Sequence, residues 1–183
     1  EVALIRAAVR LGSSLFNRAL KVLRPGVTEA EVAGEIEHAA RRAGTQGMSF
    51  ETIVAGGRRS ALPHGIASSQ PIPNKGFVVI DFGVILGGYC SDMTRTVFIG
   101  RTSKRQKKIY KTVLEAQKKA MNFVKVGRKT FDADKIAHEI LRSGSPVYKE
   151  VVKLFGSEIL NSKKAIDRKR LAGQVFSKRK SLE

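Results

Sequence analysis

Two stretches near the start of the chain repeat apolar residues at helical spacing. In residues 2–23 the apolar positions recur every three or four residues, which predicts an amphipathic helix that Arg24-Pro25-Gly26 ends. A second helix is predicted over 29–42, because Thr28 and Glu31 have the spacing of a capping box. We therefore expect the chain to open with two helices that bury one face each.

The middle of the chain carries strand patterns. Residues 50–54 are a short strand candidate, and the run FVVIDFGVIL at 77–86 is the strongest strand signal in the sequence. Gly87-Gly88 is a two-residue turn candidate, so residues 89–99 are expected to return antiparallel to that run. The pattern predicts one long β-hairpin.

Helical patterns return after the hairpin. A long basic helix is predicted over 103–126, and two further helices over 131–142 and 146–160, separated at Gly144-Ser145-Pro146. The last stretch, 161–183, is dense in lysine and arginine. The order of elements predicts an α/β chain of the α+β kind.

Composition excludes several classes of protein. Apolar residues make up 42% of the 183 residues and charged residues 27%, which is enough apolar material for a core and argues against disorder. No apolar run approaches the roughly 18 residues that a membrane span needs. Cys90 is the single cysteine, and no secretory segment opens the chain, so we expect a reducing, cytoplasmic location.

The positive charge is concentrated in the second half of the chain. The formal net charge is +18; residues 1–100 carry 11 basic and 8 acidic side chains, whereas residues 101–183 carry 23 and 8. Such asymmetry is compatible with a nucleic-acid partner. The aromatic residues do not alternate with the basic runs as a stacking surface requires, so solvated lysine faces are the favoured interpretation.

Two aspartates interrupt the strands of the predicted hairpin. With the turn at the two glycines, the register places Asp81 opposite Thr94 and Asp92 opposite Gly83. The two carboxylates are then diagonal neighbours on one face, with Cβ atoms roughly 7–8 Å apart or less. They repel one another and are costly to bury, and divalent cations between them would remove both penalties. The alternative is that Asp81 caps a loop and Asp92 pairs with Arg95.

A histidine in a loop is the next candidate. His64 lies in the run ALPHG at 61–65, which precedes a proline-containing loop. A histidine on an ordered loop can bind substrate or transfer a proton. A histidine considered by itself is more often structural or simply exposed.

Four runs that contain these residues resemble the pita-bread metallopeptidases, which include methionine aminopeptidase, aminopeptidase P and Xaa-Pro dipeptidase. The residues of these motifs are most similar to those of the Xaa-Pro group, and the resemblance covers about residues 1–127. It implies a partial pita-bread fold. The runs occur in the family's order: FETIVAGG at 50–57, SALPHG at 60–65, VIDFG at 79–83 and GYCSDMTRT at 88–96.

This resemblance implies a role for each candidate. Asp81 and Asp92 would be two of five ligands to a pair of divalent ions, Mn, Co, Zn or Fe, and His64 would contact a peptide substrate. A metal-bound hydroxide would hydrolyse the peptide bond after the N-terminal residue. The family's other ligands are a histidine beside glycine and two later glutamates. His138 and Glu158 fall in helical patterns and do not match them. We expect weak or absent metal binding, and no catalysis, by this chain as it stands.

The end of the chain resembles a different family. Residues 131–183 are similar to an internal part of dephospho-CoA kinase, in which Asp134 would act near the ribose hydroxyl that is phosphorylated. No phosphate-binding GxxxxGK[ST] run precedes the segment. The runs that carry the likeness are FDADKIAHEIL at 131–141, GSPVY at 144–148, LFGSEILN at 154–161, IDRKRLA at 166–172 and VFS at 175–177.

The two resemblances divide the chain into a metallopeptidase-like part, 1–127, and a helical part, 128–183. A join of two truncated genes near residues 127–131 would account for both. The favoured function is that of a metal-dependent aminopeptidase or Xaa-Pro peptidase. One alternative is a dephospho-CoA kinase fragment. Another is a non-catalytic module whose basic C-terminal part binds RNA or a protein.

Overall fold

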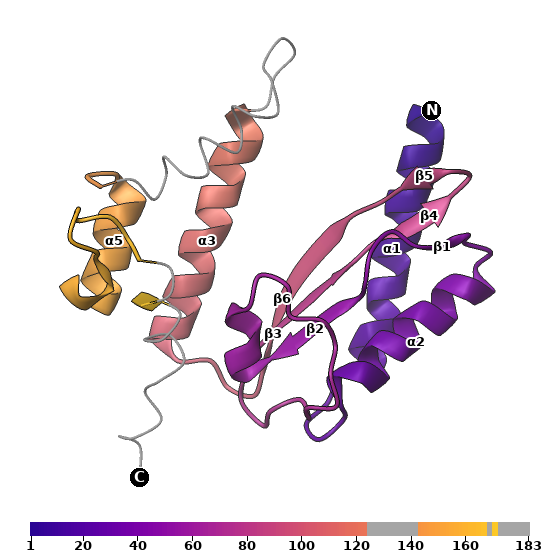
Figure 1. Ribbon diagram of the computed structural model, residues 1–183, viewed down its shortest axis with the longest axis horizontal. Coiled ribbons are helices and arrows are strands. Elements are labelled where there is room, and N and C mark those ends of the chain that lie inside the picture. Colours follow the sequence, from indigo (N-terminus) through magenta and orange to yellow (C-terminus); the bar gives the residue numbers. More distant parts are fainter. Residues whose placement is uncertain (124–142, 168–169, 172–183) are drawn as a thin grey trace. The chain divides into compact units, whose positions relative to one another are not determined.

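Figure 1 shows the computed structural model, which describes residues 1–123, 143–167 and 170–171. The chain divides into two compact units, Glu1–Arg101 and Thr102–Glu183. Among the described residues, no helix has the length and apolar character needed to cross a bilayer. The two units are described in turn.

Helices α1 and α2 confirm the first prediction. Helix α1 spans Val2–Val22 and α2 spans Glu29–Arg42. At the start of α2 the Glu31 amide donates to the Thr28 hydroxyl (3.1 Å), and the Thr28 amide donates to the Glu31 carboxylate (2.7 Å). This reciprocal pair is the predicted capping box, and it satisfies two amides at the end of the helix that would otherwise lack partners.

In the first unit, six short strands form two antiparallel sheets. The order β1-β4-β5 joins Gly47–Met48, Val84–Leu86 and Tyr89–Cys90, and the order β2-β3-β6 joins Ile53–Gly56, Gly76–Phe82 and Met93–Ile99. The predicted register is confirmed in both, since Asp81 pairs with Thr94 and Ile85 with Cys90. A short 3-10 helix, η1 (Gly57–Ala61), follows β2.

The long hairpin differs from the prediction because it changes sheet halfway. The expected strand 77–86 divides at Gly83 into β3 and β4, and its partner divides between Cys90 and Met93 into β5 and β6. A Cβ atom on Gly83 would overlap the carbonyl oxygen of Ser91, so only glycine lets the two arms of the hairpin come this close. Cys90 is exposed on β5, at the edge of its sheet.

The core of the first unit lies between the two helices and one face of the strands (Figure 1). Alternate strand residues such as Val54 and Ile80, which are opposed across β2 and β3, have no exposed surface. The residues between them, including Asp81, face the opposite side of the sheet. The helices contribute a stripe of fully or nearly buried side chains: Ala8, Leu15, Ala19, Val32, Ala33, Ile36 and Ala40.

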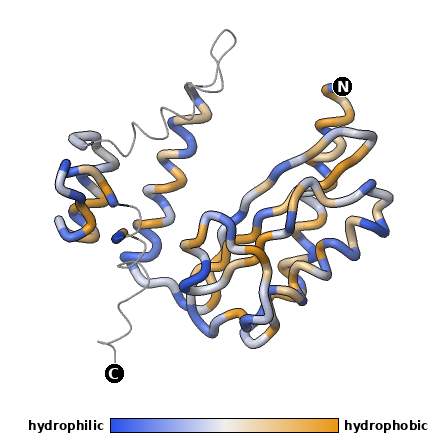
Figure 2. Tube along the Cα trace, in the orientation of Figure 1, coloured by the Kyte–Doolittle hydropathy of each residue, from blue (hydrophilic) through white to orange (hydrophobic). Residues whose placement is uncertain are grey.

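The second unit is helical. Helix α3 spans Lys104–Phe123, α5 spans Pro146–Phe155 and a 3-10 turn, η2, spans Ser157–Ile159. In Figure 2, hydrophilic colour recurs along α3. The expected helix 146–160 ends early, because Gly156 takes a left-handed φ of 80°. The expected helix 131–142 and the expected join near 127–131 lie outside the described residues.

Candidate active site

Asp81 is held at the end of β3, on the sheet face away from the helices. Its backbone pairs with Ile53 on one side and with Thr94 on the other. Two residues later, where the hairpin changes sheet, the Ser91 amide donates to the Val84 carbonyl (2.9 Å) and the Val84 amide donates to the Ser91 hydroxyl (3.0 Å). These bonds fix the backbone immediately before Asp92.

The two carboxylates influence one another as the sequence predicts. Burial raises the pKa of Asp81, a hydrogen bond with the Thr94 side chain lowers it, and the negative charge of Asp92 raises it again, with a net upward shift. Oδ1 of Asp81 is buried and accepts no hydrogen bond from the described residues. Asp92 itself is exposed.

These features fit part of a cation site. A divalent ion would supply a partner for the unsatisfied Oδ1 and neutralise the repulsion between the two aspartates. No cluster of three or more His, Cys, Asp or Glu side chains occurs in the part of the chain that the structure describes. His138, which does not match the family's histidine ligand, lies outside that part, and so does Asp134.

His64 is exposed in the loop that follows η1. Two residues later Ile66 forms an isolated antiparallel bridge with Ile53, which is itself the partner of Asp81. One row therefore crosses the sheet in the order Ile66, Ile53, Asp81, Thr94. With an interstrand spacing of about 4.8 Å, the end of the His64 loop lies roughly 10 Å from the backbone of Asp81. The structure brings all three candidates to one region of the first unit.

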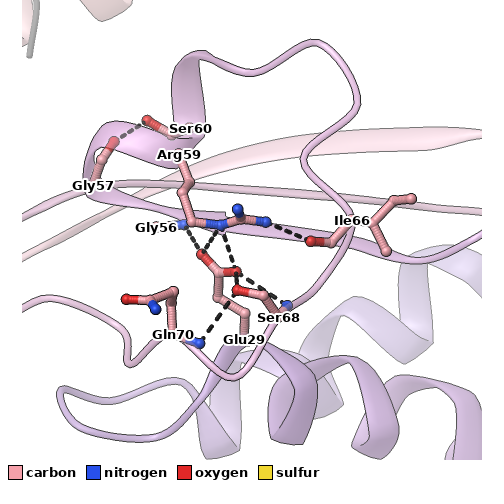
Figure 3. Close-up of polar contacts among 8 residues, drawn as sticks. All are labelled: Glu29, Gly56, Gly57, Arg59, Ser60, Ile66, Ser68 and Gln70. Carbon is pink, nitrogen blue, oxygen red and sulfur yellow. Dashed lines mark hydrogen bonds and ion pairs between the residues drawn. The ribbon is translucent and has the colours of Figure 1, made fainter.

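A buried carboxylate beside this loop escaped the sequence analysis. Glu29, the first residue of α2, is 1% exposed, and it contacts the ends of the loop through Gly56, Arg59 and Ser68 (Figure 3). An acid in the first turn of a helix is normally read as a solvated partner of the helix dipole. A signal was present, because Glu29 lies three, four and seven residues before Val32, Ala33 and Ile36, on the buried stripe.

Comparisons with known proteins agree with the geometry. A sequence model described as metallopeptidase family M24 matches residues 3–174. The chain is 39% identical, over 142 residues, to the Xaa-Pro dipeptidase of Pyrococcus furiosus, an alignment that covers 78% of this chain and 41% of the relative.

Solved structures give the same result. The Xaa-Pro dipeptidase from Bacillus anthracis matches with a TM-score of 0.73 and 42% identity, covering 79% of this chain and 41% of that one. The prolidase from Pyrococcus furiosus matches with a TM-score of 0.74 and 36% identity, covering 88% and 45%. The chain thus spans about two fifths of the length of these relatives.

Proposed function

Because the chain belongs to metallopeptidase family M24, we propose that it supplies the metal-binding aspartates and the substrate-contacting histidine of a peptidase that removes residues from peptide N-termini, with Xaa-Pro peptides as the substrate class. The observation that carries the proposal is the carboxylate pair. Asp81 and Asp92 interact across the point where the hairpin changes sheet, and one Asp81 oxygen is buried without a hydrogen bond from the described residues. His64 lies in the loop whose end is two strands away from Asp81 in the same row of the sheet.

Asp81 and Asp92 would hold divalent cations, Mn, Co, Zn or Fe. Bound there, such cations lower the pKa of water and polarise a peptide carbonyl. Thr94 is the partner of Asp81 on β6, and Oδ1 of Asp81, which has no hydrogen bond from the described residues, is available to the cation. Gly83 permits the two arms of the hairpin to approach closely, and this approach fixes the backbone before Asp92.

His64 would act on the substrate. It is exposed, and the loop that carries it is held against the edge of β2. A neutral imidazole can donate a hydrogen bond to the oxygen of the scissile peptide as negative charge develops there. Leu62 and Ile66 flank it with 49% and 45% of their surface exposed, and they offer apolar contacts to the substrate side chain.

Calorimetric titration with Mn²⁺ tests the carboxylate pair. We expect Asp81→Asn to weaken Mn²⁺ binding at least tenfold, because one of two charged ligands is lost. Glu37→Gln, an exposed change of the same charge on α2, should bind as the unmodified chain does. Equal affinity of the Asn variant and the unmodified chain would refute the site.

The stability of the metal-free chain gives a second readout. The pKa of Asp81 is raised in the folded state, so ionised Asp81 costs stability as the pH rises through that pKa. The metal-free Asp81→Asn chain should therefore melt at a temperature equal to or above that of the unmodified chain at pH 7. A variant that loses both metal and stability would mean that Asp81 is only structural.

Peptidase activity is a separate question, because two aspartates are fewer ligands than the family uses. We propose that the chain as it stands turns over an Xaa-Pro dipeptide in Mn²⁺ buffer very slowly or not at all. Rapid turnover that a chelator abolishes would show that residues of this chain complete the site.

For residues 131–183 we propose the likeness to dephospho-CoA kinase as a second candidate. It rests on the sequence runs alone, and the family M24 model, which matches residues 3–174, covers most of the same segment. Without a phosphate-binding loop, the segment should give no thermal shift with ATP. A shift that depends on Asp134 would favour a kinase function over the peptidase for this part.

A further inference from the structure

The carboxylate of Glu29 is the most heavily hydrogen-bonded side chain near the proposed site. Its Oε1 accepts from the Gly56 amide (2.8 Å) and from Nε of Arg59 (3.2 Å). Its Oε2 accepts from Nε of Arg59 (2.9 Å), from the Ser68 hydroxyl (2.6 Å) and from the Ser68 amide (3.2 Å). Figure 3 shows these donors converging on one carboxylate that is 1% exposed.

These donors come from the two ends of the loop that carries His64. Gly56 ends β2 and Arg59 lies in η1, before the histidine, whereas Ser68 follows it. Arg59 closes the arrangement, because its Nη2 donates to the carbonyl of Ile66 (2.6 Å), while its Nε binds Glu29. One ion pair, in which Glu29 is buried and Arg59 is partly exposed, therefore ties both ends of the loop to the start of α2.

The backbone reinforces the same connection. The amide of Glu29 donates to the Gln70 carbonyl (3.0 Å), and the amide of Ala30 donates to the Ser68 carbonyl (2.9 Å). The first turn of a helix has amides without partners inside the helix. Here the segment after the loop supplies acceptors for two of them, so the position of that segment depends on α2.

His64 is fixed through its neighbours. A Cβ atom on Gly65 would come within 2.9 Å of the Ala55 side chain, so the residue next to His64 lies directly on β2. His64 itself is exposed. Its direction is consequently set by the anchored residues on either side of it, and these are the residues that Glu29 and Arg59 hold.

We propose that Glu29 is a positioning residue that fixes the loop presenting His64 to the peptide substrate. The role given to His64 rests on the proposed function. The carboxylate does not reach the substrate itself; it sets the geometry of the loop. In Glu29→Gln, an NH2 group replaces one carboxylate oxygen and faces the hydrogen-bond donors of Gly56, Arg59 and Ser68. Because two donors cannot bond to one another, the ends of the loop would separate from α2.

Amide hydrogen exchange in the full chain tests the positioning role directly. In Glu29→Gln we expect exchange of the amides between Arg59 and Ser68 to rise at least tenfold, while the β3 and β6 amides change less than twofold. Glu31→Gln, in the same turn of α2 but exposed, is the matched control and should leave the loop unchanged. Unchanged loop exchange, or an equal rise throughout the first unit, would overturn the proposal.

A spectroscopic readout separates positioning from stability. In the unmodified chain loaded with diamagnetic Zn²⁺, an Xaa-Pro dipeptide should shift the imidazole signal of His64, and His64→Ala should weaken dipeptide binding. Glu29→Gln should weaken dipeptide binding at least fivefold with the Mn²⁺ affinity unchanged. Equal dipeptide affinities of Glu29→Gln and the unmodified chain would contradict the proposal.

Two further variants keep the outcomes distinct. Glu29→Asp keeps the charge and should recover part of the dipeptide affinity, which a loss of folding would not. If Glu29→Gln does not fold, Ser68→Ala removes the 2.6 Å bond and should raise loop exchange about threefold. If the unmodified chain binds no dipeptide, the role of His64 fails in this chain, and the exchange measurement still decides whether Glu29 holds the loop.

Discussion

The two units of this chain stabilise their folds by different means. The first, Glu1–Arg101, buries a continuous core between two helices and a pair of sheets, and it includes fully buried Phe82, Ile36 and Ile80. Among the described residues of the second, the buried cluster consists of Val151, Phe155 and Ile159, with partly buried residues around it. Burial of apolar surface stabilises by about 25 cal/mol per Å², so the described core of the first unit, which is the larger of the two, should give that unit the greater reserve of folding free energy.

Charge separates the units as well. The first carries nearly balanced charge, and its buried acid, Glu29, is paired with Arg59. The second is strongly basic, and Arg105 lies 4.9 Å from the ring centre of Phe155, where cation and ring attract. Chemistry that requires fixed geometry is therefore best supported in the first unit, where the larger described core holds the backbone in place.

The largest effect should come from the core of the first unit. Phe82→Ala removes a side chain with no exposed surface and should lower the free energy of unfolding of that unit by about 3–5 kcal/mol. Urea denaturation, monitored by amide hydrogen exchange, shows which unit is destabilised. An equal loss of protection in α5 would break the comparison, because the units would then unfold together.

The matched change in the second unit is Phe155→Ala. Phe155 is 7% exposed and belongs to a small cluster that can collapse around the gap, so the cost should lie at the low end of the range, about 3 kcal/mol. Because the reserve is smaller there, α5 should lose exchange protection entirely while β3 and β6 keep theirs. Persistent protection of α5 would show that this unit has a larger core than its buried residues indicate.

Sequence reasoning performed differently in the two units. In the first, the helices, the capping box and the register at Asp81 were predicted because apolar periodicity and turn glycines are local signals. The change of sheet at Gly83 was not, since it depends on the approach of Ser91 from the opposite strand. In the second, apolar residues return at Ile159 and Leu160 after Phe155, and the positive φ of Gly156 reveals where the helix ends.

The candidate site shows the same limit. Asp81 and Asp92 were placed together by counting residues from a turn, and Asp81 does lie where the count puts it. Glu29 was missed because its donors come from a loop about 30 to 40 residues later in the chain. A partner at that distance leaves no periodic trace, although the position of Glu29 on the buried stripe of α2 was a usable indication.

Helix caps offer a finer comparison of the units. The Thr28 hydroxyl caps α2 and the Ser145 hydroxyl caps α5, accepting from the Tyr148 amide (2.9 Å). Thr28→Ala and Ser145→Ala should each cost about 1 kcal/mol. We expect thermal unfolding, monitored by circular dichroism, to show a small shift for Thr28→Ala in the transition of the first unit. Ser145→Ala should give a larger shift in the transition of the second unit. The same shift in both would contradict the difference in reserve.

The smallest effect concerns pH. The backbone amide of Thr28, followed by its hydroxyl, holds the pKa of Glu31 below its ordinary value. A lowered folded-state pKa stabilises above the unfolded pKa, and the stabilisation is lost as pH falls through the folded value. Glu31→Gln should therefore melt slightly below the unmodified chain at pH 7, and the difference should vanish once the pH has fallen below the lowered pKa of Glu31. A difference independent of pH would assign the effect to something other than the carboxylate charge.

The glycine at the change of sheet also sets how freely the gene can vary. At position 83 every codon for another residue would place an atom on the Ser91 carbonyl, whereas Gly34, within α2, has nothing within 4 Å of its missing side chain. A library of single-codon changes should lose nearly all variants at the first position and retain many at the second. Position 83 should therefore tolerate almost no amino-acid substitution, although the atoms of this glycine take no part in the chemistry.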